Sequence, residues 1–183
     1  MAKSKVKSNQ MDKAWYALAL ARISLGFIFI WAFFDKLFGL GFATCRDAKT
    51  EVVSTFCDKA WVNGGSPTTG FLKFAAKGPF KDFYNGLAGN TLIDWLFMVG
   101  ILLIGIALIA GIATKLAAVT GSLLLLMMWT AALWPDNNPV LDDHIVYIFV
   151  LGVIGYSGAA NQKLSISSWW SKQSLAKKFP ILR

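Results

Sequence analysis

Charged side chains are scarce in this sequence. They make up 15% of its 183 residues, whereas hydrophobic residues make up 56% and the mean hydropathy is +0.53. A soluble globular chain uses about a quarter of its residues as charges to cover its surface. The shortage excludes a soluble enzyme and predicts a membrane protein.

Histidine and cysteine are also rare: there is one histidine, His144, and two cysteines. One histidine cannot supply bis-histidine haem ligation, which leaves only histidine with methionine open. The sequence holds no cluster of metal-ligating residues, no phosphate loop and no dinucleotide fingerprint. We therefore expect no metal, haem or nucleotide on this chain, and a flavin or nicotinamide would belong to a partner.

The net charge of +8 comes from basic residues that crowd the two ends of the chain. They do not gather along a helix or loop that could follow a duplex. Nucleic-acid binding is therefore excluded as well.

Four apolar runs approach the roughly 20 residues that a membrane-spanning helix needs. Each run is apolar all round, which favours helices over barrel strands. The predicted fold is all-α: one membrane domain, a bundle of four transmembrane helices with a long structured exterior loop between helices 1 and 2. The expected spans are about 14–34, 92–113, 116–134 and 140–159, and the loop is 35–90.

The distribution of lysine and arginine predicts the orientation. The tails 1–13 and 160–183 are basic, whereas the connection 134–141 has no basic residue. By the positive-inside rule both termini are cytoplasmic and 35–90 is exterior. The first run is longer than the apolar core of a signal peptide, so it should be retained. We expect a multi-pass protein of the cell (plasma) membrane.

Within the exterior loop, residues 70–77 read as a short helix lying at the membrane interface. Phe71, Phe74 and Ala75 should face lipid, with the lysines of the segment toward water.

Arg22 lies about 12 Å inside the first span at 1.5 Å per residue, too deep for contact with lipid. It should face the bundle, where the small residues Ala19 and Gly26 allow a neighbouring helix to approach. Two interpretations remain open. Arg22 stabilises negative charge during catalysis, or it is a structural arginine satisfied by carbonyls.

His144 is the strongest candidate for chemistry. Asn138 as N-cap, Pro139 at the first helical position and two aspartates in the first turn make a good helix start. His144 follows them, with Tyr147 on the same helix face. A neutral imidazole there can hydrogen-bond a carbonyl or transfer a proton, and Asp143 or another acid could adjust its affinity for that proton. The alternative is a histidine that merely marks the membrane boundary.

Asp94 has two interpretations as well. It follows Thr91 by three residues, a capping-box spacing, yet it can also deliver a proton. Together with Lys36 and His144 it falls at the exterior end of a predicted helix, which suggests one site open to the outer leaflet. Lys36 with Arg46 could attract an anionic donor to that site.

Cys45 and Cys57 both fall in the exterior loop. In an oxidising compartment the default is a structural disulfide. The alternative is a redox pair that passes electrons to a quinone, for which the spacing gives only weak support.

Several segments together resemble the DoxX/DoxD family, and in particular its DoxD-like branch. The resemblance covers most of residues 14–160. Its most specific parts are Trp61-Val-Asn-Gly-Gly-Ser-Pro and Asn138-Pro followed by Asp142-Asp-His144, and Phe33 departs from it because a glycine is usual there. The looser parts are Arg22 to Phe27, Asp35-Lys36-Leu37, Gly78-Pro79-Phe80 and Asp94-Trp95.

That family includes the large membrane subunit of thiosulfate:quinone oxidoreductase. The resemblance implies an oxidoreductase subunit that takes electrons from a reduced sulfur compound such as thiosulfate and passes them to membrane quinone as substrate. His144 would bind the quinone, and Asp143 or Asp94 would supply a proton. The expected partners are membrane lipid, quinone and a second redox subunit or further copies of the chain. A rival hypothesis is a non-catalytic anchor for an exported redox enzyme.

Overall fold

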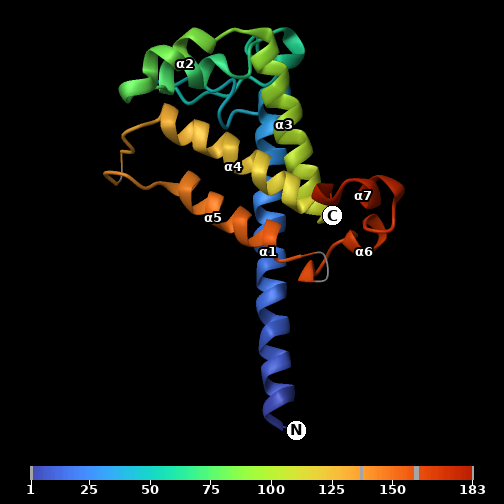
Figure 1. Ribbon diagram of the computed structural model, residues 1–183. Helices are drawn as coiled ribbons and strands as arrows, with labels where there is room; N and C mark the ends of the chain where they lie inside the picture. The colour runs from blue at the N-terminus through green and yellow to red at the C-terminus, as the bar shows by residue number, and fades with distance from the viewer. Residues whose placement is uncertain (1, 137, 159–160, 183) are drawn as a thin grey trace.

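The computed structural model describes residues 2–136, 138–158 and 161–182, with side chains from Met11 onward. Throughout these ranges the regular structure is helical and contains no strand, only an isolated bridge between Arg46 and Val53. The longer helices are α1 (Ala2–Phe38), α2 (Lys81–Leu87), α3 (Thr91–Ala110), α4 (Thr114–Ala131) and α5 (Asp143–Tyr156) (Figure 1). The short ones are η1 (Trp61–Asn63), η2 (Gly70–Ala75), η3 (Gly78–Phe80), α6 (Ser167–Trp170), α7 (Ser174–Lys178) and η5 (Pro180–Leu182).

Three helical segments are long and apolar enough to cross a membrane: Met11–Phe38, α3 and α4. They indicate a membrane protein. α5 has 14 residues and spans about 21 Å, less than the roughly 30 Å of a hydrocarbon core. The first three predicted spans therefore correspond to long helices, while the helix in the fourth covers only the middle of 140–159.

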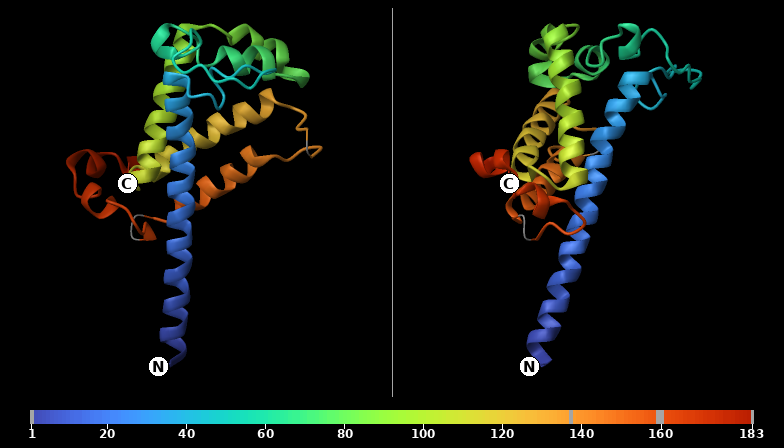
Figure 2. Two further views of the ribbon diagram at one scale, coloured as in Figure 1. Left: turned by 180° about the vertical axis from the view of Figure 1, so that it is seen from behind. Right: turned by 90° about the vertical axis from the view of Figure 1, so that its right-hand side faces the viewer.

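α1 and α3 pack closely side by side (Figure 2). A Cβ atom on Gly26 would lie 2.8 Å from Ile109 Cγ1 and 3.1 Å from the Gly105 carbonyl oxygen. Only glycine lets the two backbones approach this closely, and van der Waals packing of that kind drives helix association in lipid. The prediction that small residues on the Arg22 face admit a neighbouring helix is confirmed.

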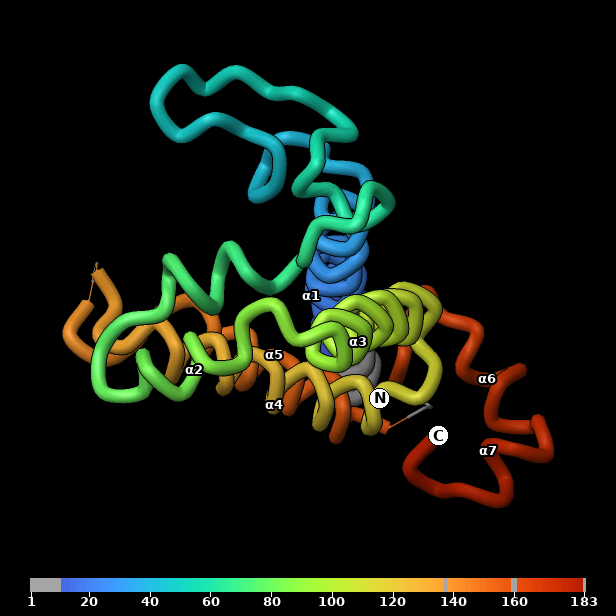
Figure 3. Tube along the Cα trace, turned by 90° about the horizontal axis from the view of Figure 1, so that it is seen from above, coloured from blue at the N-terminus to red at the C-terminus, as the bar shows by residue number. Residues whose placement is uncertain are grey.

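α4 and α5 form a second pair, which leans away from α1 and α3 (Figures 1 and 3). Gly155 allows their close approach, since a Cβ there would lie 2.7 Å from Ala118 Cβ. We call the end of the molecule that carries residues 39–90 the loop end, and the opposite end the tail end. The buried apolar core between the pairs comprises Leu25, Phe29, Met98, Ile101, Ile104, Leu108, Ala117, Ala118, Leu125, Leu151 and Ile154.

Residues 39–90 divide into two parts with different positions (Figure 3). The arm, residues 41–57, projects beside the end of α1. The cap, residues 61–90, passes over the loop ends of α3 and α4 and contains η1, η2, η3 and α2. The prediction that Phe71 faces lipid is wrong: Phe71 packs beside the buried Leu72 against the rest of the cap, whereas Phe74 and Ala75 are exposed.

A disulfide closes the arm on itself, and polar contacts fasten it to α1. A disulfide joins Cys45 to Cys57. The buried carboxylate of Asp35 accepts hydrogen bonds from the backbone N–H groups of Phe42 and Ala43, both at 2.9 Å. At the tip, the backbone N–H groups of Thr50 and Lys49 hold the pKa of Asp47 below its usual range. The arm is therefore a defined structure and not a free loop.

The start of α5 differs from the prediction. Asn138 accepts from the N–H groups of Val140 and Leu141 in a local turn, and no helix follows it directly. The N-cap is Asp142, whose carboxylate accepts from the N–H groups of His144 and Ile145. An aspartate satisfies orphan helix donors as well as asparagine does, so two capping sequences competed here and the later one prevails.

Candidate functional site

A cavity of about 660 Å³ lies at the loop end between the two helix pairs. α1, α3, α4 and α5 supply its walls, and the cap closes it through Pro67, Thr68, Phe71, Leu72, Tyr84 and Leu87. The walls are overwhelmingly apolar, which is typical of sites for hydrophobic ligands with a few fixed polar contacts. The polar side chains in its lining are Lys36, Thr68, Tyr84, Thr120, Asp143, His144 and Tyr147.

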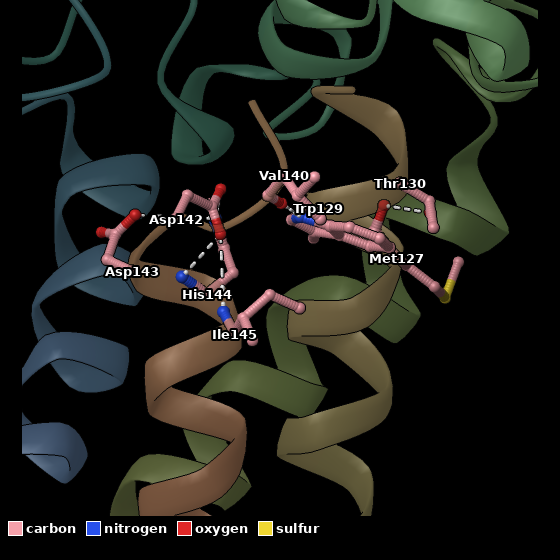
Figure 4. A network of polar contacts seen from close by, with 8 residues as sticks. All are labelled: Met127, Trp129, Thr130, Val140, Asp142, Asp143, His144 and Ile145. Carbon is pink, nitrogen blue, oxygen red and sulfur yellow. Dashed lines mark hydrogen bonds and ion pairs between the residues drawn. The ribbon is translucent and has the colours of Figure 1, made fainter. Parts of the chain in front are cut away.

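His144 is held by the residue that begins its own helix (Figure 4). Its Nδ1 atom lies 2.7 Å from Asp142 Oδ2, while the other oxygen of Asp142 caps the helix. The side chains of His144 and Asp142 are only 20% and 18% exposed. Because the carboxylate is an acceptor, Nδ1 carries the proton, and Nε2 is left to accept a proton or, when the ring is charged, to donate one.

Asp143 lies on the other side of the histidine and is 69% exposed. Its Oδ1 atom is 3.8 Å from His144 Nδ1, and it also lines the cavity. It thus joins the aqueous surface to the ring. Asp142, Asp143 and His144 offer ligand atoms within 4.8 Å of one another and could hold a divalent cation, although the direct hydrogen bond already satisfies Asp142 and His144.

Lys36 enters the cavity from the last turn of α1. Its Nζ atom lies 5.8 Å from the centroid of the Phe97 ring. The neighbouring carboxylate of Asp35 is engaged by backbone N–H groups. Lys36, His144 and Tyr147, each a predicted site residue, therefore line one cavity with Asp143.

Asp94 does not belong to this cavity. Its buried carboxylate accepts from the hydroxyls of Ser66 and Thr68, at 2.9 and 2.5 Å, and so ties the cap to α3. The capping-box prediction is also wrong, because Asn90 is the N-cap and accepts from two N–H groups of the first turn. The structure gives Asp94 a structural contact and leaves it outside the cavity lining.

Arg22 lies at the tail end and is fully buried. Its Nη1 donates to the carbonyls of Leu108 and Ile109 in the last turn of α3, and its Nη2 donates to those of Lys163 and Leu164 at 3.0 and 2.9 Å. The 13 residues between Arg22 and Asp35 correspond to about 20 Å of helix. The geometry matches the structural interpretation: a guanidinium that satisfies helix-terminal carbonyls.

A second link supports the same junction at the tail end. Lys163 Nζ lies 3.0 Å from Asp12 Oδ1 and 5.6 Å from the Tyr16 ring centroid. The hydrogen bond and charge of Asp12 raise the pKa of Lys163. This end of the bundle is thus assembled by polar contacts to α1.

Arg46 does not join Lys36 in the cavity lining. Its Nε donates to the Gly41 carbonyl at 2.7 Å within the arm, and it does not line the cavity. The cysteines lie in the arm as well. The structure therefore does not bring Arg46 or the disulfide into the site that contains His144.

Sequence reasoning missed three contacts that shape the site. Asp142 was read only as a first-turn acid, although its position two residues before His144 also fits an N-cap. The Tyr84 hydroxyl lies 2.6 Å from Thr130 Oγ1 and fastens the cap to α4. Trp129 Nε1 donates to the Val140 carbonyl at 2.9 Å, which fixes the approach to α5 (Figure 4).

Comparisons with models of known protein families, with curated proteins and with solved structures find no match to this chain. The resemblance to the DoxX/DoxD family stays a prediction, and the functional argument rests on the cavity.

Proposed function

We propose that this chain is the quinone-binding membrane subunit of an oxidoreductase in the cell membrane. The observation that carries the proposal is His144, braced by Asp142, in the lining of an apolar cavity of about 660 Å³. Quinones combine a ring bearing two carbonyl oxygens with an apolar tail. A cavity with many apolar walls and few polar groups suits such a ligand.

The residues around the ring can manage the protons of the reaction. Reduction of a quinone to a quinol takes up two electrons and two protons. The charged form of His144 donates from Nε2 to a quinone oxygen, while Asp142 keeps the ring oriented. Asp143, exposed and 3.8 Å from Nδ1, adds a second negative charge that stabilises the charged ring, and Nε2 regains its proton from water.

The apolar tail of the quinone has a route out of the cavity. Leu96 of α3 and Leu123 of α4 line it and are 62% and 59% exposed. Ile28 on α1 combines the same two properties. A membrane-dissolved quinone can therefore enter sideways from lipid, without crossing water.

The proposal includes four spans with both termini in the cytoplasm. α5 runs antiparallel to α4, so its ends reach the same two sides of the molecule (Figure 1). Val140 and Leu141, in the turn before α5, are apolar and exposed, and they lengthen its apolar surface at the loop end. The loop end then faces the exterior, in agreement with the basic tails.

Electrons reach the quinone from a reduced sulfur compound such as thiosulfate, as the DoxX/DoxD resemblance implies. The sequence contains no nucleotide fingerprint, so a second redox subunit supplies the electron carrier. The arm offers a surface for an exterior partner, since Phe42, Val52 and Phe56 are all more than half exposed. The same surface favours the rival hypothesis, a non-catalytic anchor for an exported redox enzyme.

Purified chain distinguishes the two functions. We expect stoichiometric quinone in a lipid extract of the wild-type protein and saturable quenching of tryptophan fluorescence when quinone is added back. His144→Gln should weaken that binding. Leu175→Gln, on an exposed position at the tail end, is the matched control and should bind normally. A purified chain that neither carries nor rebinds quinone would favour the rival hypothesis, a non-catalytic membrane anchor for an exported redox enzyme.

A further inference from the structure

Lys36 places an unpaired positive charge in the cavity lining. Within the described residues no carboxylate oxygen lies within 4.0 Å of its Nζ atom, and no hydrogen bond to it is formed. The nearest carboxylate along the chain, Asp35, is buried and binds the backbone of the arm through both oxygens. The ammonium lies 5.8 Å from the centroid of the Phe97 ring, and Asp35 acts on it only as a charge at a distance, without an ion pair.

An ammonium in apolar surroundings is costly unless an anion compensates it. Here Phe97 and the mainly apolar walls of the cavity surround it, and the carboxylate of Asp143 in the same lining forms no ion pair with it. A neutral carbonyl can accept a hydrogen bond from Lys36 but cannot neutralise it. An anionic oxygen does both, and charge-assisted hydrogen bonds are the stronger ones.

We propose that Lys36 is the anion anchor of the cavity, so that the preferred ligand is an amphiphile whose ring or head carries an ionised hydroxyl group. The inference rests on the proposed function, because it concerns the same cavity and the same kind of ring. It adds the chemical form that the site selects: the anionic oxygen contacts Lys36, and His144 contacts a second oxygen of the ring.

The test uses the purified full chain and two probes of nearly equal size. One is a 2-hydroxy-3-alkyl-1,4-naphthoquinone, whose hydroxyl is ionised at neutral pH, and the other is its neutral 2-methoxy analogue. Binding is followed by quenching of tryptophan fluorescence. We expect the hydroxyl probe to bind about 10- to 100-fold more tightly, as one charge-assisted hydrogen bond predicts.

Three variants assign the preference to Lys36. Lys36→Met should bind the two probes equally, and Lys36→Arg should keep the preference. Lys115→Met, which removes an exposed lysine at the tail end, is the control for net charge and should behave as wild type. An unfolding temperature of Lys36→Met equal to that of wild type shows that the variant is folded.

The outcomes separate this inference from the proposed function. Equal binding of both probes by the wild type, or an undiminished preference in Lys36→Met, overturns the anion anchor and leaves the quinone site standing. Failure of both probes to bind the wild type overturns the quinone site and, with it, the role of Lys36 in binding an anion.

Discussion

At the scale of the residue, His144 has one nitrogen fixed and one free. Asp142 binds Nδ1 at 2.7 Å and also caps α5, so the ring and the helix start are positioned by the same carboxylate. A positioned side chain that transfers a proton contributes about 10²- to 10⁴-fold to a rate. Thiosulfate-dependent quinone reduction in membranes should fall by that factor in His144→Ala, with unchanged protein yield.

Asp142→Asn refines that test. Asparagine is as good an N-cap as aspartate, so the helix start survives. The neutral amide is a weaker acceptor for Nδ1–H, and it no longer stabilises the charged ring. We expect a smaller loss, about 10-fold. Full turnover in both His144→Ala and Asp142→Asn would place the reaction elsewhere.

Arg22 is predicted to act on stability and not on the cavity. Arg22→Ala leaves the carbonyls at the end of α3 and those of Lys163 and Leu164 without their donor, and an unsatisfied buried group costs about 1–3 kcal/mol. Thermal unfolding in detergent should show a lower Tm than wild type. Removal of the exposed Lys115 should change Tm little. Loss of quinone affinity at an unchanged Tm would contradict this assignment.

The sequence could identify His144 but not the role of Arg22. A lone histidine beside two acids is a local pattern, visible in three adjacent residues. The partners of Arg22 are separated from it by 86 to 142 residues along the chain. Only the packing of α1 against α3 and the tail brings those carbonyls to it, so both interpretations remained open until the structure was known.

At the scale of the element, close helix contacts depend on glycine at defined positions. Gly26→Ala would place a methyl group 2.8 Å from an Ile109 side-chain atom and 3.0 Å from its backbone nitrogen, and overpacking of this kind costs about 1–3 kcal/mol. Gly152→Ala on α5 meets nothing within 4 Å and should be neutral or stabilising. Equal unfolding temperatures for the two variants would contradict the α1–α3 contact.

The disulfide is predicted to hold the arm and to take no part in electron transfer. Replacing Cys45 and Cys57 together by serine should lower the free energy of unfolding by an amount in the lower part of the range of about 2–4 kcal/mol. The loss is small because the loop they close is short. Quinone binding should persist, since neither residue lines the cavity. A variant that binds quinone normally but loses turnover would restore the interpretation as a redox pair.

Apolar runs located the long helices well, because a run of about 20 hydrophobic residues has few other solutions in a membrane protein. The start of the last helix was less certain. Asn138 and Asp142 both suit an N-cap, and the segment between them is held by a tertiary contact, the Trp129 bond to Val140, that the local sequence does not reveal. The position of the cap over the cavity could not be predicted either. It depends on hydrogen bonds between residues far apart in the sequence, from Tyr84 to Thr130 and from Thr68 to Asp94.

At the scale of the whole molecule, the two helix pairs and the cap surround the cavity at the loop end. Reporter fusions test the topology. We expect fusions near residues 60 and 136 to be active only as exterior reporters, and a fusion after residue 182 to be active only in the cytoplasm. An exterior C-terminus would show that α5 does not complete a fourth span.

The central claim is that the cavity between the helix pairs holds the quinone, and filling it is the most direct test. Gly100 lines the cavity and Gly152 does not, yet a Cβ on either meets nothing within 4 Å. Neither substitution clashes at the Cβ atom, so quinone titrations of Gly100→Phe and Gly152→Phe can be compared once their unfolding temperatures show that both are folded. We predict that Gly100→Phe abolishes quinone binding while Gly152→Phe binds as wild type. Normal binding by a folded Gly100→Phe protein would contradict the claim.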